Sequence, residues 1–180
     1  MLKNDAWIEQ QALKGMIKPF VGKKVSDGVL SYGLESFGYT FRLANKFKVY
    51  RKGCEICVDP KNLVSESYLD LTKEAIEIYP NSYVTGQSIE AFDIPPDVFG
   101  LVFGKSSYAR LGIEIIVTPI EPGWRGRITV GIANHQKSPI KVYANEGIAQ
   151  IVFFQGEPCL TTYNGNYQDQ ENIQLTRILK

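Results

Sequence analysis

The chain has 180 residues, a length typical of one folded domain whose core buries roughly 70% of the surface that the unfolded chain exposes. Its 20 Lys and Arg residues nearly balance its 19 Asp and Glu residues, which leaves a formal net charge of +1. This balance argues against a global field for nucleic acid or an anionic membrane, so we expect neither partner.

A short amphipathic helix is predicted over residues 4–15, between the capping residue Asn4 and the terminal Gly15. Beyond it, short segments rich in β-branched and aromatic residues recur between turn signals such as Pro95-Pro96. The predicted strands cover residues 39–43, 47–50, 74–78, 82–89, 98–103, 113–117, 127–133, 140–143 and 148–154. This pattern predicts a mainly β fold, an antiparallel sandwich or barrel.

The organisation of the sequence favours one domain over residues 1–180, because no repeat or linker divides it. The polar tail, residues 155–180, is predicted to be a mobile C-terminal arm. No apolar run approaches the ~20 residues that a membrane-spanning helix needs. No signal-peptide pattern opens the chain, so we expect a cytoplasmic location.

Residues 104–112 combine the cations Lys105 and Arg110 with two serines and two glycines, directly after a predicted strand. Glycines let backbone N–H groups approach an anion while Lys and Arg supply charge, which is typical of a phosphate cradle. A nucleotide-binding P-loop is excluded because Phe99 stands where that motif needs its first glycine. On composition alone, a phosphate cradle and an ordinary polar turn both stay open.

Cys54 and Cys57 have the spacing of half a zinc site or of a redox pair. A zinc site would also need Cys159 and His135, and nothing in the sequence brings these residues together, so we expect thiols and no zinc. The chain also lacks the His-x-Glu and Pro-Cys-x-x-Cys signatures of zinc-dependent nucleobase deaminases. His135 itself is expected to lie in solvent at a strand end.

Three segments, 104–112, 117–126 and 143–151, together resemble the bacterial dCTP deaminases in both residue types and spacing. Further agreement comes from residues 4–8, 16–20, 31–34, 37–39, 58–62 and 177–180. The chain is therefore identified as similar to the dCTP deaminase/dUTPase family over essentially its whole length.

The resemblance implies a distorted, jelly-roll-like β-barrel of the dUTPase type, with a short N-terminal helix, assembled as a homotrimer whose sites lie between subunits. It implies the family reaction, in which dCTP and water give dUTP and ammonia without zinc; some members also cleave the triphosphate. The implied partner is a deoxynucleoside triphosphate, dCTP or dUTP. Mg²⁺ would accompany the triphosphate, with no metal held directly by the protein.

The resemblance also assigns roles to individual residues. The triphosphate would be bound by Lys105, Ser106, Ser107, Tyr108, Ala109 and Arg110, with Gln150 near the phosphates. The base and sugar would be met by Val117, Thr118, Trp124, Thr129, Val130 and Gly131. The arm would close over the nucleotide with Tyr163 and Gln170, and the catalytic residues would be Glu121, Ser106 and Arg110.

The chain departs from the deaminase pattern at the general acid/base. The family has a glutamate ten residues after the carboxylate of its Ile-Asp/Glu-Pro segment, and here that position is Gly131. Losing such a group typically costs roughly 10²-fold or more in rate. Thr40 and Asn166 likewise replace an aspartate and a lysine of the family pattern.

Two functions of different class follow from these departures. In one, Glu121 activates water against the triphosphate, which gives a dUTPase-like pyrophosphohydrolase. In the other, the chain binds a nucleotide without catalysis, as a regulator or decoy; deamination by a changed mechanism also stays open. Glycine at position 131 further predicts free space beside the base, enough for a bulkier pyrimidine.

Overall fold

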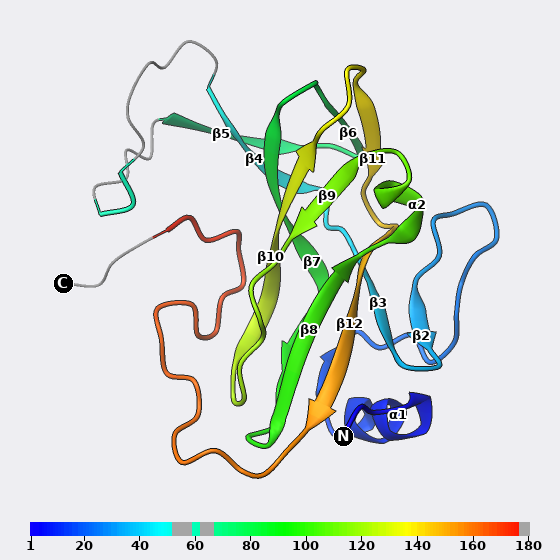
Figure 1. The fold of residues 1–180 in the computed structure, drawn as a ribbon, viewed down its shortest axis with the longest axis vertical. Helices are drawn as coiled ribbons and strands as arrows, with labels where there is room; N and C mark the ends of the chain where they lie inside the picture. Colours follow the sequence, from blue (N-terminus) through cyan, green and yellow to red (C-terminus); the bar gives the residue numbers. More distant parts are fainter. Residues whose placement is uncertain (52–58, 62–66, 177–180) are drawn as a thin grey trace.

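The computed structural model describes residues 1–51, 59–61 and 67–176, and it is mainly β (Figure 1). The elements, in chain order, are α1 (Asp5–Leu13), β1 (Ile17–Lys18), β2 (Gly33–Glu35), β3 (Gly38–Arg42), β4 (Lys46–Tyr50), β5 (Tyr68–Thr72), β6 (Ala75–Ile78), β7 (Tyr83–Asp93), β8 (Val98–Gly104), α2 (Ser106–Ala109), β9 (Ile113–Ile116), β10 (Arg125–Asn134), β11 (Ile140–Tyr143) and β12 (Gly147–Gln155). Each of the nine predicted strands corresponds to one of these strands, so the predicted mainly β class is confirmed.

The predicted N-terminal helix is confirmed as α1. The Asn4 side chain accepts a hydrogen bond from the backbone N–H of Trp7 at 3.2 Å, which satisfies one of the free donors of the first turn. Ile8 and Ala12 are buried against the strands, and the helix ends before Gly15, whose φ of 106° is in the left-handed region. In the described part of the chain, no helix is long and apolar enough to cross a membrane.

The strands form two larger antiparallel sheets. One has the order β5-β4-β7-β10-β9, with β1 also paired to β7, and the other has the order β2-β3-β12-β8. A third, two-stranded sheet pairs β11 with β6. Phe41 of β3 meets Phe92 of β7 edge to face, with ring centroids 6.0 Å apart, so aromatic packing joins the two larger sheets.

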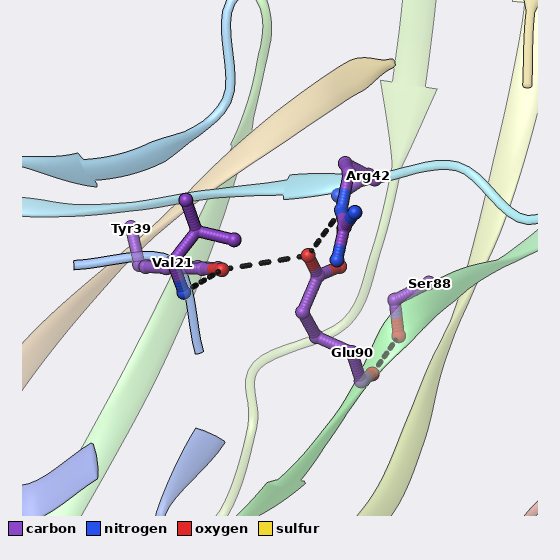
Figure 2. Close-up of polar contacts among 5 residues, drawn as sticks. All are labelled: Val21, Tyr39, Arg42, Ser88 and Glu90. Atoms are coloured by element: carbon purple, nitrogen blue, oxygen red, sulfur yellow. Dashed lines mark hydrogen bonds and ion pairs between the residues drawn. The ribbon is translucent and has the colours of Figure 1, made fainter. Parts of the chain in front are cut away.

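A buried ion pair also joins these sheets (Figure 2). Glu90 of β7 is fully buried and accepts from the Nε of Arg42 at 2.8 Å and from the backbone N–H of the same residue at 2.9 Å. The hydroxyl of Tyr39 lies 3.4 Å from Glu90, and burial, aided by the charge of Glu90, raises the pKa of this phenol. Both partners of Glu90 belong to β3, so the carboxylate fixes β3 against β7.

Ser88 extends the same network to β10. Its Oγ donates to the backbone carbonyl of Glu90 at 2.6 Å and accepts from the backbone N–H of Ile128 at 2.8 Å. The register between β7 and β10 shifts between Arg127 and Thr129, because a bulge of β7, residues 88–90, lies opposite the single residue Ile128, whose N–H is satisfied by Ser88. The bulge thereby sets which residues of β10 follow on each face.

We predict that Arg42→Met lowers the free energy of unfolding by about 3–5 kcal/mol, because it leaves the Glu90 carboxylate buried without its partner. The double variant Arg42→Met/Glu90→Gln should regain most of this loss, since the charge is gone and an amide oxygen still accepts from the backbone N–H of residue 42. Urea unfolding at one fixed protein concentration measures both.

The control for this experiment is Lys48→Met, which breaks an ion pair of 2.6 Å with the exposed Asp70. It should cost less than about 1 kcal/mol because the Asp70 carboxylate that it leaves behind is exposed and hydrated. Equal losses for Arg42→Met and Lys48→Met would show that the buried pair contributes nothing special.

Candidate functional site

A cavity of about 350 Å³ brings together most of the residues that the sequence assigns to the base, the sugar and the arm. The turn after β9 and strand β10 contribute Val117, Thr118, Glu121, Trp124, Thr129 and Gly131. The C-terminal arm, residues 156–176 of the structure, contributes Tyr163 and Gln170. A larger cleft of about 700 Å³ shares only Gln170 with this cavity, so the cavity is the better candidate site.

The turn that carries Glu121 is held by backbone hydrogen bonds on both sides. Ile120 is buried and exchanges two bonds of 2.9 Å with Gly100 of β8. The backbone N–H of Trp124 closes the turn on the carbonyl of Glu121 at 3.1 Å, across Gly123, which has a φ of 80°. The Glu121 side chain is exposed, so this rigid turn presents a carboxylate at the mouth of the cavity.

The C-terminal arm runs back along β10 and forms one wall of the cavity (Figure 1). The indole N–H of Trp124 donates to the carbonyl of Tyr167 at 2.8 Å, and the amide of Gln170 donates to the hydroxyl of Thr129 at 3.0 Å. Gly126 makes this approach possible: a Cβ there would lie 2.8 Å from the backbone oxygen of Gln170. The arm therefore closes over the same residues that line the base and sugar side.

An exposed ion pair completes the attachment of the arm. The guanidinium of Arg125 donates to both carboxylate oxygens of Asp169, at 2.8 and 3.1 Å. This fork geometry matches the planar carboxylate. The hydrogen bond from Arg125 lowers the pKa of Asp169, so the pair is intact at neutral pH.

The predicted phosphate-binding segment lies outside this cavity. Ser106, Ser107, Ala109 and Arg110 are exposed on and beside α2, while Lys105 is half-buried and donates to the hydroxyl of Ser31 at 2.8 Å. Burial lowers the pKa of Lys105. The Lys105 ammonium therefore sits where an added negative charge would stabilise it.

Two of the predicted nucleotide contacts have their side chains in the core. Tyr108 is 2% exposed, burial raises its pKa to about 12, and its hydroxyl accepts from the backbone N–H of Tyr143 at 3.0 Å. Val130 is fully buried. These two side chains hold α2 and β10 in place and are not available to contact a ligand.

A second group of residues surrounds the strand pair β3–β12. The amide of Gln150 donates to the carbonyl of Phe37 at 3.1 Å, and Gln150 pairs in register with the buried Thr40. The hydroxyl of Thr40 lies 3.4 Å from the carboxylate of Glu35, which also pairs with Lys24 at 3.1 Å. Glu35 thus places a carboxylate next to the position where the family pattern has an aspartate.

The residues weighed as metal ligands do not form a site in the described part of the chain. His135 lies 2.8 Å from Glu114, and both are exposed; Cys159 is exposed as well. Cys54 and Cys57 lie outside the described residues. Over residues 1–51, 59–61 and 67–176, no three His, Cys, Asp or Glu side chains are grouped as metal ligands would be.

Comparison with known proteins places this arrangement in a family. A family model described as dCTP deaminase-like matches residues 2–156. The chain belongs to the dCTP deaminase-like family. It is 48% identical over 181 residues to a dCTP deaminase of Acidobacterium capsulatum, with 98% of the chain and 99% of that protein covered. It is 46% identical over 184 residues to a dCTP deaminase of Campylobacter fetus, with 99% of each covered.

A solved structure shares the fold. The 2′-deoxycytidine 5′-triphosphate deaminase from Agrobacterium tumefaciens superposes with a TM-score of 0.63 at 18% identity over 86% of this chain. Our chain spans 48% of the length of that solved chain. The predicted β fold of the family, with its N-terminal helix, is therefore confirmed.

We predict that Asp169→Asn weakens the attachment of the arm to β10, because it removes the negative charge that pairs with Arg125. Chymotrypsin should cut after Tyr167 about two- to five-fold faster in this variant, a range set by the modest strength of exposed ion pairs. Mass spectrometry of the fragments gives the rate. Asp70→Asn, which breaks an ion pair with Lys48 that includes no arm residue, is the control and should leave the rate unchanged.

The direction of the Asp169 pKa shift adds a pH dependence. Because the folded-state pKa is lowered, the contribution of the pair is present above the ordinary pKa of aspartate and is lost as the pH falls through the lowered value. Acid should therefore change the fluorescence of Trp124, which the arm contacts, and this step should be missing in Asp169→Asn. An identical acid titration of both proteins would contradict the role of the pair.

Proposed function

We propose that the protein is a pyrophosphohydrolase that cleaves a deoxypyrimidine nucleoside triphosphate, with dUTP as the favoured substrate. One observation carries this proposal: among the described residues that line the cavity, Glu121 is the only carboxylate. Deamination by the family mechanism needs a proton-transferring group where Gly131 stands. A site with one general base suits hydrolysis of the triphosphate better than the exchange of an amine for a hydroxyl.

In this reaction, Glu121 accepts a proton from water, and the water oxygen bonds to the α-phosphorus. The bond from that phosphorus to the bridging oxygen breaks, so dUTP and water give dUMP and pyrophosphate. The exposed position of Glu121 at the mouth of the cavity agrees with this role. The buried Trp124, held by the carbonyl of Tyr167, would lie against the sugar and leave no room for a ribose 2′-hydroxyl.

The donor set of the site fits Mg²⁺ that arrives with the substrate. Mg²⁺ takes phosphate oxygens and waters with one or two carboxylates, and it seldom needs a complete protein cage. Over the described residues, no group of three metal-ligating side chains is present, while Glu121 supplies one carboxylate near the expected phosphates. The ion would neutralise phosphate charge in the bound nucleotide.

We further propose that the site is completed by a second copy of the chain, as part of a homotrimer. The cavity that contains Glu121 is lined by no residue of the 105–110 segment. Figure 1 shows the arm beside β10 and α2 beyond β9, on the opposite side of the molecule. In a cyclic trimer, the cavity of one copy can face α2 of the next, so base and triphosphate are bound by different subunits.

Deamination of dCTP is the second candidate, and the names of the relatives at 46–48% identity favour it. In that reaction Glu121 would have to take a proton from the water that attacks the base and pass one to the leaving amine. Release of ammonia from dCTP, measured beside release of pyrophosphate from dUTP, distinguishes the two functions.

We predict that Glu121→Gln lowers kcat for pyrophosphate release by about 100-fold or more, because an amide cannot accept the proton of water. KM should change little, since the shape of the side chain is kept. The control is Glu114→Gln, an exposed carboxylate outside this cavity. Undiminished turnover in Glu121→Gln would remove Glu121 from the mechanism.

Subunit mixing tests the shared site. Arg110→Ala and Glu121→Gln should each be inactive as pure proteins. When the two are co-expressed, about a quarter of the sites combine intact groups from two neighbouring copies, so activity should return to about that fraction of wild type. No recovery from co-assembled mixtures would place both residues in sites built from one chain.

A further inference from the structure

The space beside Gly131 is filled by Tyr83, a residue that the sequence did not single out. Gly131 pairs in register with Thr85, and Tyr83, two residues before it on β7, pairs with Ala133. A Cβ built on Gly131 would lie 2.3 Å from the Tyr83 hydroxyl and 2.7 and 2.8 Å from two of its ring carbons. The predicted free space at position 131 is therefore wrong, because a phenol occupies it.

Tyr83 also faces the candidate site. It lines the same cavity as Glu121, Trp124 and Thr129, and its side chain is half-exposed there. On the other flank of Gly131, the register partner is Ile116 of β9, an apolar residue that lines the cavity too. The Tyr83 hydroxyl is thus the polar group nearest to the position where the family carries its glutamate.

We propose that Tyr83 is the specificity-determining residue of this cavity: its phenol replaces the missing side chain of position 131 and presents an O–H to the exocyclic group of the base. This inference rests on the proposed function. An ionised carboxylate only accepts hydrogen bonds and so suits an amine, whereas a phenol can donate one. Compared with a carboxylate at that place, Tyr83 therefore favours a pyrimidine with a carbonyl there, the chemistry of uracil, over the amine of cytosine.

The same geometry couples positions 83 and 131. Any side chain larger than hydrogen at 131 must displace the phenol, because a contact of 2.3 Å lies far inside van der Waals distance. Gly131→Ala is therefore expected to push Tyr83 out of its place and to have the same functional effect as removing the hydroxyl. For the same reason, Gly131→Glu alone does not rebuild a deaminase site.

A double-mutant cycle tests this inference with wild type, Tyr83→Phe, Gly131→Ala and the double variant. The measurement is the ratio of kcat/KM for pyrophosphate release from dUTP to that from dCTP. Tyr83→Phe should lower this ratio about ten-fold, which is the size of one lost hydrogen bond. Gly131→Ala should lower it similarly, and the double variant should fall no further, because both changes remove the same contact. Tyr79→Phe, equally exposed but outside the cavity, should leave the ratio unchanged.

The outcomes separate this inference from the proposed function. If wild type cleaves dUTP and Tyr83→Phe keeps the wild-type ratio, the inference falls and the function stands. Fully additive effects of the two single changes would likewise overturn the coupling. If wild type cleaves neither nucleotide, the function falls, and the ratio of Kd values for non-hydrolysable dUTP and dCTP analogues is compared instead. If Tyr83→Phe raises the Kd for the dUTP analogue relative to that for the dCTP analogue, the inference is supported; an unchanged ratio, or no binding at all, overturns it.

Discussion

The buried contact between Glu90 and Arg42 is the constraint on which the rest of the structure depends. It holds β3 of one sheet against β7 of the other, and Ser88, in the bulge of β7, extends the same network to Ile128 of β10. The register of β7 against β10 then places Tyr83 over Gly131 and Thr129 toward the cavity. A fully buried carboxylate outside the cavity therefore aligns the strands that form the site.

Much of the fold could be predicted because local signals and tertiary packing agree. Asn4 caps α1, and each of the nine predicted strands has a counterpart in the structure. The two- and three-residue strands β1 and β2 were missed because their few residues carry too little periodicity, and β5 was missed as well. Helix α2 was missed for a similar reason: its four residues lie in a segment whose composition also fits a loop.

The candidate site was predicted unevenly, and the reasons are physical. The residues of the turn and of β10 are close in sequence, so the motif assigned them to the same site, and the structure places them in one cavity with the arm. Tyr83 could not be found that way, because its position over Gly131 depends on the pairing of two distant strands. Nor could spacing show that the 105–110 segment and Glu121 lie apart in one protomer, since that separation arises from the fold of the whole chain.

The phenol over Gly131 limits which amino-acid substitutions can restore a carboxylate to this site during evolution. A carboxylate regained at position 131 by a single codon change would meet an occupied volume, so it would disturb the cavity before it could contribute any chemistry. The tyrosine must move aside or be replaced as well, and that step offers no proton-transferring group of its own. The pair thus behaves as an evolutionary ratchet, in which a residue on one strand locks in a loss on its neighbour.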